Sequence, residues 1–261
     1  MKNILFLALW IFFSVNAFAG VLEEKGLKIA READRVRSGF SDSRSDLVMI
    51  MKDSHGHESF RSLDVRILER KEDGNMSMTI FQSPADVKGT AFLVSGHKIT
   101  SDDQWLYLPA LKRVKRIASD DKSGSFMGSE FAYEDIGAQA HQLEKYTYRY
   151  LREEAYDKMP CFVIERRPLD PNSGYKRQEV WIDQTEYQNR KIDYYDRKGS
   201  LLKTLTYRNY QHYQDRFWRA IEWFVVNHQT GKSTLVTWNN WRFGTGLTKE
   251  DFSQEALKRV K

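Results

Sequence analysis

The fold is decided by the stretch Ser62-Leu63-Asp64-Val65-Arg66-Ile67, in which apolar and polar side chains alternate strictly. The stretch Met76-Ser77-Met78-Thr79-Ile80 repeats the same period of two. Successive side chains of a β-strand point to opposite faces, so both stretches predict strands with one dry face and one wet face. The residues Asp73-Gly74-Asn75 between them are typical of a hairpin turn.

The same pattern continues along most of the chain. Further strands are predicted at Asp46–Lys52, Gly89–Ser95, Gln104–Leu108, Arg113–Ile117, Lys145–Glu153, Cys161–Arg167, Lys176–Asp183, Gln188–Asp196, Leu201–His212, Trp218–Asn227 and Ser233–Trp241. No unit repeats and no Pro/Gly/Ser-rich linker divides the chain. We therefore predict a mainly β protein with a few helices (α+β), built on a single curved antiparallel sheet of roughly a dozen strands.

Three segments break the strand pattern. Apolar residues at helical spacing predict a helix over Val21–Arg37, and Ser38-Gly39 ends it. A short helix or ordered loop is expected within the Ser/Gly-rich segment Ser119–Ala140. A capping box starting at Thr248 predicts a C-terminal helix.

Composition excludes several classes of protein. The 261 residues are 41% hydrophobic, 30% charged and 13% aromatic, too polar for a polytopic membrane protein and too aromatic for a disordered chain. The net charge of +5 comes from 41 basic and 36 acidic residues, a mixed surface that does not predict nucleic-acid binding. One cysteine excludes an intrachain disulfide framework, and Cys161 is predicted to be a buried thiol because its neighbours are apolar.

The N-terminus has the three parts of a secretory signal peptide. Lys2 is the basic part, Ile4 to Val15 is an apolar run of about twelve residues, and Ala17-Phe18-Ala19 is a cleavage site. The run is shorter than the roughly twenty residues of a membrane span. We expect cleavage after Ala19 and export to the periplasm. Gly20 stands where a bacterial lipoprotein carries its acylated cysteine, so the protein is not expected to be a lipoprotein itself.

No catalytic, cofactor or metal motif stands out. The chain has no G-x-S-x-G elbow, phosphate loop or H-E-x-x-H motif, so no catalytic residue, cofactor or metal is predicted. His55 and His57 are read as a solvated turn. Glu130, Glu134 and Asp135 are read as structural carboxylates near a helix start rather than a catalytic pair. The basic run Lys112–Arg116 is read as a solvated edge strand, with anionic lipid as the alternative partner.

Packing arguments predict a ligand site. A twisted sheet of this size must curl, close or split, and two or three helices cannot cover one whole face. We therefore expect a curved sheet whose partly covered apolar concavity binds an apolar molecule. The predicted acyl-chain lining consists of apolar residues from the alternating strands: Leu63, Val65, Ile67, Met76, Met78 and Ile80, with Val180 and Ile182 opposite.

Three successive stretches carry a family resemblance. They are Phe81–Leu93 (FQSPADVKGTAFL), Asp103–Ile117 (DQWLYLPALKRVKRI) and Gly128–Ile136 (GSEFAYEDI). This succession resembles the outer-membrane lipoprotein-sorting protein family, the LolA/LolB-like superfamily, and most of all its periplasmic branch found beside RND-type exporters.

The resemblance implies a fold and a function. It implies an incomplete β-barrel of about eleven antiparallel strands, with helices plugging the concave face and acyl chains bound between sheet and helices. Residues 1–19 would then be a signal peptide and residues 20–261 a single LolA-like carrier domain. The expected cargo is a lipid or an acylated lipoprotein, moved between inner and outer membrane with transient membrane contact. An RND-type exporter and an outer-membrane acceptor are the implied partners.

Two other functions stay open. An integral outer-membrane β-barrel shares the signal peptide and the alternating strands, with Trp181, Trp218, Trp223, Trp238 and Trp241 available as aromatic girdles. A secreted carbohydrate-binding or carbohydrate-active β protein would use exposed tryptophans to stack on sugars.

Overall fold

The computed structural model describes residues 4–136 and 143–259, with side chains from residue 20 onward. All thirteen predicted strands are present. They are β1 (Asp42–Lys52), β2 (Glu58–Leu68), β3 (Met76–Ser83), β4 (Ala91–Ser95), β5 (Asp103–Leu108), β6 (Arg113–Arg116), β7 (Tyr146–Tyr156), β8 (Met159–Pro168), β9 (Tyr175–Asp183), β10 (Asn189–Asp196), β11 (Leu201–Tyr213), β12 (Phe217–Asn227) and β13 (Ser233–Phe243). The count corrects the eleven strands that the family resemblance implied.

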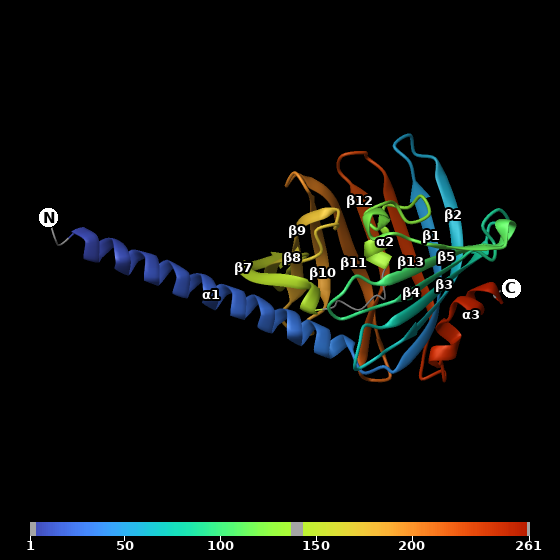
Figure 1. The fold of residues 1–261 in the computed structure, drawn as a ribbon, viewed down its shortest axis with the longest axis horizontal. Coiled ribbons are helices and arrows are strands. Elements are labelled where there is room, and N and C mark those ends of the chain that lie inside the picture. Colours follow the sequence, from blue (N-terminus) through green and yellow to red (C-terminus); the bar gives the residue numbers. More distant parts are fainter. Residues whose placement is uncertain (1–3, 137–142, 260–261) are drawn as a thin grey trace.

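Every strand pairs antiparallel in one curved sheet (Figure 1), in the order β6-β5-β4-β3-β2-β1-β13-β12-β11-β10-β9-β8-β7. The chain thus runs outward from β1 to one edge, crosses to the other edge, and returns strand by strand until β13 lies beside β1. The edges are β6 and β7, so the sheet forms an incomplete barrel. The segment joining β6 to β7 must cross the open side of this barrel.

Three α-helices and four short 3₁₀ helices accompany the sheet. They are α1 (Ile4–Arg37), α2 (Tyr133–Ile136), α3 (Gln254–Lys258), η1 (Pro109–Leu111), η2 (Ser119–Asp121), η3 (Leu143–Lys145) and η4 (Lys249–Phe252). The predicted capping box is present, because Thr248 and Asp251 bind each other's backbone N–H at the start of η4. The predicted helix end is also confirmed, since the Ser38 N–H donates to the Asp34 carbonyl and Gly39 has a φ of 89°.

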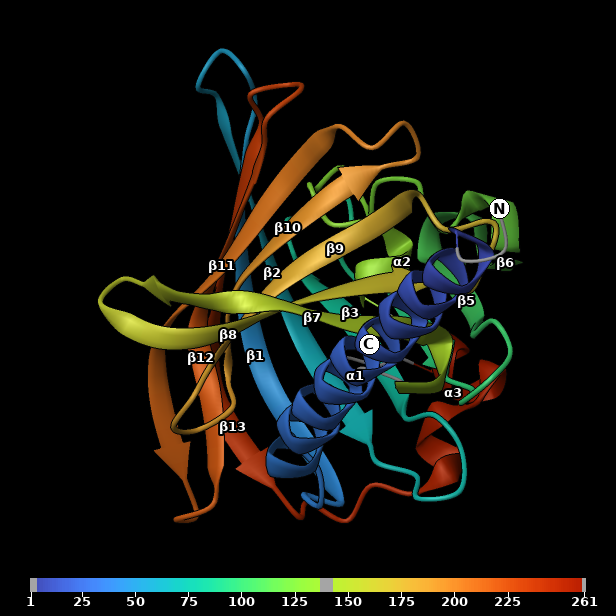
Figure 2. The same ribbon diagram turned by 90° about the vertical axis from the view of Figure 1, so that its left-hand side faces the viewer.

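Helix α1 crosses the open side of the sheet beside β7 and β8 (Figure 2). Contact is close at Gly26, where a Cβ atom would lie 2.7 Å from the backbone of Arg149 and Tyr150. Figure 1 shows that the N-terminal part of α1 projects beyond the sheet. The helix begins earlier than the predicted Val21 and continues through the predicted cleavage site. Among the described residues, no helix combines the length and apolar character needed to cross a bilayer.

The two larger apolar cores among the described residues lie on opposite faces of the sheet. The concave core contains Leu63 and Val65 of β2 and is covered by α1, α2 and the segment before α2. The second core joins Met78 and Ile80 of β3 to Leu257 of α3 on the convex face. Helices therefore cover part of the concave face as expected, but the C-terminal helix lies on the other side.

Candidate functional site

The segment before and including α2 fills one half of the concavity. We call residues 119–136 the plug segment, because they belong to the connection between the two sheet edges. Phe126 lies 5.9 Å from the Phe81 ring and 5.2 Å from the Phe92 ring, both on the sheet. The Glu130 N–H donates to the Thr234 hydroxyl of β13 at 3.0 Å. The space left beneath the plug segment is only about 20 Å³.

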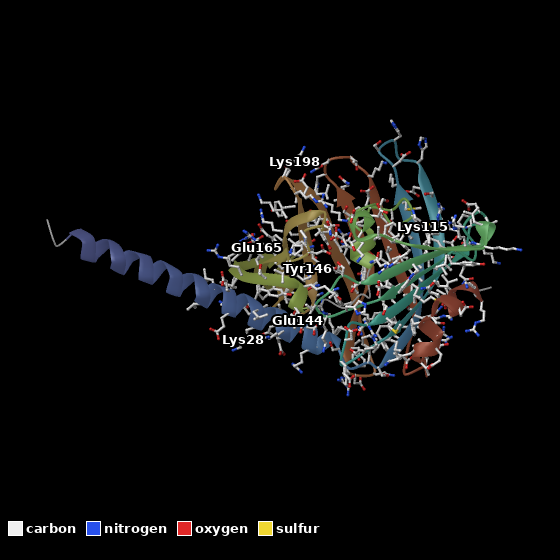
Figure 3. All side chains as sticks on the ribbon, viewed as in Figure 1. Lys28, Lys115, Glu144, Tyr146, Glu165 and Lys198 are labelled. Carbon is white, nitrogen blue, oxygen red and sulfur yellow. The ribbon has the colours of Figure 1, made fainter. Side chains whose placement is uncertain are left out.

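The other half of the concavity holds a cavity of about 520 Å³, within the usual range of small-molecule pockets. Its walls come from the end of α1 and from strands on both sides of β1, so residues far apart in the sequence meet there. Tyr146, labelled in Figure 3, lies at the start of β7 and belongs to this lining.

Tyr207, Trp223 and Trp241 line one wall of the cavity, and Trp238 and Phe243 pack against them from behind. The Tyr207 ring lies edge-on to Trp223 at 5.4 Å, and Trp223 lies 5.0 Å from Trp238. Trp238 stacks on Trp241 at 5.2 Å, and Trp241 stacks on Phe243 at 5.7 Å. Rings packed in this way present a wide, rigid apolar surface. The wall suits an aliphatic or aromatic ligand portion.

The predicted lining residues do not form one surface. Ile67 lines the large cavity, while Leu63 and Val65 line the small space beneath the plug segment. Val180 and Ile182 are buried in the concave core but line neither space among the described residues.

The strand register separates the three residues of β3 from the others. Leu63 lies opposite Phe81 and Val65 opposite Thr79, whereas Met78 lies opposite Arg66. Met76, Met78 and Ile80 therefore face the convex side, in or against the core under α3. Side chains alternate between faces along each strand, so pairing Met78 with Arg66 settles the face of all three.

A buried ionic cluster lies between the plug segment and the sheet. Lys203 of β11 contacts Asp135 at 2.6 Å, with side chains 5% and 8% exposed. The Tyr175 hydroxyl donates to the same carboxylate at 3.0 Å. Glu134 accepts hydrogen bonds from the Ser173 hydroxyl at 2.7 Å and the Gly174 N–H at 2.9 Å. These contacts tie α2 to the sheet, which agrees with the structural role predicted for the two carboxylates.

Burial changes the protonation of this cluster. Burial, reinforced by the neighbouring Asp135 carboxylate, raises the pKa of Glu134 from its ordinary 4.5 to about 7. Burial also raises the pKa of Tyr175 well above its ordinary value. Glu134 therefore titrates near neutral pH.

Three arginines that the sequence analysis did not single out line the same cavity. They are Arg37 at the end of α1, Arg166 of β8 and Arg219 of β12. Burial, together with the positive charge of Arg37, lowers the pKa of Arg219 to about 10. Burial likewise lowers the pKa of Arg37. A lowered arginine pKa indicates a cation that lacks full compensation from solvent or counter-ions.

The other residues discussed from the sequence have ordinary surroundings. The His57 ring lies 2.9 Å from Asp53 in an exposed hairpin turn, and no cluster of at least three metal-ligand side chains occurs among the described residues. Lys115 lies on edge strand β6 (Figure 3). Cys161 is buried and unpaired as predicted, and burial raises the pKa of its thiol.

The five tryptophans considered as aromatic girdles are buried or half-buried. Trp181 and Trp238 are buried. Trp218, Trp223 and Trp241 are half-buried around the cavity.

The chain is similar to proteins of known structure and to one family of sequences. A family model described as an uncharacterized protein matches residues 73–259. A crystal structure described as an outer membrane lipoprotein-sorting protein domain from Vibrio parahaemolyticus is 50% identical, with a TM-score of 0.88, covering 91% of this chain and all (100%) of that one. A DUF1329 family protein from Desulfovibrio piger is 31% identical, with a TM-score of 0.85 and coverage of 90% and 99%.

A more distant structure shares the fold. A LolA superfamily protein from Nitrosomonas europaea is 20% identical, with a TM-score of 0.72 and coverage of 88% and 97%. No curated protein matches the chain in sequence.

Proposed function

Because this chain belongs to the family of outer membrane lipoprotein-sorting protein domains, we propose that it is a carrier that binds the acyl part of a lipid or lipoprotein. The observation that carries the proposal is the cavity of about 520 Å³ against the aromatic wall. Each buried CH₂ group contributes about 0.8 kcal/mol, so an acyl tail is held tightly there.

The proposal includes export to the periplasm. Residues 1–19 act as a signal peptide and are removed after Ala19, leaving a protein that is not acylated. In support, the N-terminal part of α1 projects beyond the sheet (Figure 1), whereas Lys25 lies over the Tyr150 ring of β7 at 3.5 Å and Gly26 packs against the Arg149 backbone. Intact-mass measurement of the exported protein tests this step. A chain that retains residues 1–19 would contradict it.

The proposal also includes transfer of cargo between inner and outer membrane, with an RND-type exporter as donor and an outer-membrane acceptor. Ile99 and Leu169 line the cavity yet are 81% and 58% exposed. Apolar side chains beside a cavity suit transient contact with a membrane or a partner protein. Cargo can then pass without meeting water.

Binding without catalysis is part of the same proposal. Glu134 and Asp135 are occupied by Ser173, Gly174, Tyr175 and Lys203. Glu130 accepts a hydrogen bond from Asn227 at 2.7 Å. All three carboxylates thereby hold the plug segment in place.

Two buried isoleucines on neighbouring strands provide a matched test. Ile67 lines the cavity, while Ile80 lies on the convex face, and they are 4% and 1% exposed. A phenylalanine at position 67 extends into the cavity, so Ile67→Phe is expected to weaken binding of a fluorescent fatty acid. Ile80→Phe, which overpacks the other core, is expected to leave binding by the folded protein unchanged.

Native mass spectrometry and lipid extraction of gently isolated protein complete the test. A co-purifying acylated molecule supports a carrier and identifies its cargo class. If no acylated molecule co-purifies and the fluorescent fatty acid does not bind, the carrier proposal is wrong. Recovery of the protein in the membrane fraction after a high-salt wash would favour the integral outer-membrane protein instead.

A further inference from the structure

The three cavity arginines point to the chemistry of the cargo. Building on the carrier function proposed above, we propose that the cargo bears an anionic group beside its acyl chain, a phosphate or a carboxylate, and that Arg37, Arg166 and Arg219 bind it. The aromatic wall takes the acyl chain.

The arginines gather from three distant parts of the chain. Arg219 donates through Nη2 to the Arg37 carbonyl at 3.4 Å, although the two residues are 182 positions apart. Arg37 is also repelled by the positive charge of Arg166. Like charges assembled inside a cavity destabilise the unliganded protein, and an anion relieves that repulsion.

The carboxylates of the cavity do not neutralise these arginines. Among the described residues, none of the three arginines has a carboxylate oxygen within 4.0 Å. Asp34 attracts Arg37 from one helical turn away, and Glu69 attracts Arg219, but burial of each arginine outweighs the attraction. The remaining acidic lining residues have other partners: Glu69 with the N–H groups of Gly39 and Ser41, Asp102 with Lys145, Asp135 with Lys203, Asp170 with Ser101, and Glu134 with Ser173.

Two of the three arginine side chains, Arg166 and Arg219, are held in place before any ligand arrives. Arg166 donates through Nε to the Gln178 side chain at 2.5 Å and lies 5.0 Å from the Tyr146 ring. Arg219 donates to the Trp218 carbonyl at 2.9 Å and lies within 6 Å of the rings of Phe40, Phe217, Trp241 and Phe243, at 5.3, 5.5, 5.6 and 5.3 Å. Side chains ordered in advance lose little entropy on binding.

Trp241 connects the arginines to the aromatic rings. The Arg219 guanidinium lies 5.6 Å from the Trp241 ring. Trp241 also belongs to the aromatic wall, so the cationic end and the apolar end of the cavity meet at this residue. The arrangement matches an amphiphile.

Two lipids that differ only by a phosphate test the inference. Lysophosphatidic acid and monoacylglycerol with the same acyl chain are titrated into the exported protein by calorimetry. The phosphate-bearing lipid is expected to bind at least about tenfold more tightly, because hydrogen bonds to charged groups exceed the roughly 1.4 kcal/mol that corresponds to a factor of ten. Added salt is expected to reduce the difference in affinity between the two lipids, because ions screen the charges of the arginines and the phosphate.

Variants that remove one positive charge each test whether these arginines bind the phosphate. Arg37→Gln, Arg166→Gln and Arg219→Gln are each expected to weaken lysophosphatidic acid binding about tenfold while monoacylglycerol binding is unchanged. Arg113→Gln, at an exposed position on β6, is the matched control. The comparison of the two lipids on the unaltered protein stands even if a variant fails to fold.

Three outcomes would overturn the inference. Equal binding of both lipids by the unaltered protein would show that the arginines are structural, and the carrier function would still stand. Inorganic phosphate that binds alone and is not displaced by lysophosphatidic acid would indicate a site for a free anion. Failure of both lipids to bind would remove the carrier function itself, and this inference with it.

Discussion

Replacing Glu134 by glutamine is expected to stabilise the protein at alkaline pH and not at acidic pH. Burial raises the pKa of Glu134 from 4.5 to about 7 in the folded protein. Below pH 4.5 both folded and unfolded chains hold the proton, so the residue has no effect. Between pH 4.5 and 7 only the folded chain keeps it, and the free energy of unfolding falls as pH rises.

The magnitude follows from the size of the pKa change. A shift of about 2.5 units corresponds to about 3 kcal/mol of lost stability once the pH exceeds 7. Glutamine carries no charge, and its side-chain oxygen accepts from the Gly174 N–H as Glu134 does at 2.9 Å. Glu134→Gln is therefore expected to gain up to about 3 kcal/mol at pH 8, and less than about 1 kcal/mol at pH 5.

Urea unfolding followed by tryptophan fluorescence at both pH values measures these differences. Glu153→Gln, at an exposed position of β7, is the control and is expected to shift neither value. The comparison between variant and parent cancels the titration of all other groups. If Glu134→Gln changes the stability equally at pH 5 and pH 8, Glu134 does not titrate near neutrality and the reasoning is wrong.

Other substitutions test the remaining contacts. Gly26→Val is expected to lower the free energy of unfolding by about 1–3 kcal/mol, because its Cβ would lie 2.7 Å from the Arg149 backbone. Urea unfolding midpoints measure the loss. Gly20→Ala is the control, because no atom lies near the added Cβ at that position. Lys203→Met is expected to cost about 3–5 kcal/mol by leaving Asp135 buried without its partner, and an unchanged midpoint would contradict that pairing. The buried Cys161 thiol is expected to resist alkylation until the chain unfolds, and rapid labelling of the native protein would refute its burial.

Local sequence signals were sufficient for the elements themselves. Each predicted strand is present, and the Thr248 capping box and the helix end at Gly39 are confirmed. Alternating side chains, helix caps and turns depend on residues that are close in sequence, so they can be predicted from the sequence alone. The strand count was better predicted by this alternation than by the family resemblance.

The lining of the candidate site could be predicted only in part. Alternation gives each strand two faces, but the face that meets the concavity depends on register with the neighbouring strand. Met78 and Leu63 look equivalent in sequence, and pairing of β2 with β3 places them on opposite faces. The only sequence signal for the register between β2 and β3 was the turn Asp73-Gly74-Asn75. A turn of this kind predicts a hairpin but does not define which residues pair across it.

The arginines were missed for a related reason. Arg166 and Arg219 each lie within a predicted strand, where a charged residue ordinarily marks the wet face. In this fold the concave face also lines a cavity of about 520 Å³ that the plug segment does not fill. A charge on a strand therefore does not distinguish solvent from cavity.

The sequence by itself determined the strands, the turns, the helix boundary near Gly39 and the resemblance to the lipoprotein-sorting protein family. Only the tertiary structure decided which face is concave, which half the plug segment closes, and which charges meet in the cavity. The reason is that these features rest on contacts between distant residues, such as Arg37 with Arg219 across 182 positions. Such contacts form when a curved sheet brings its two ends together, and no local pattern encodes them.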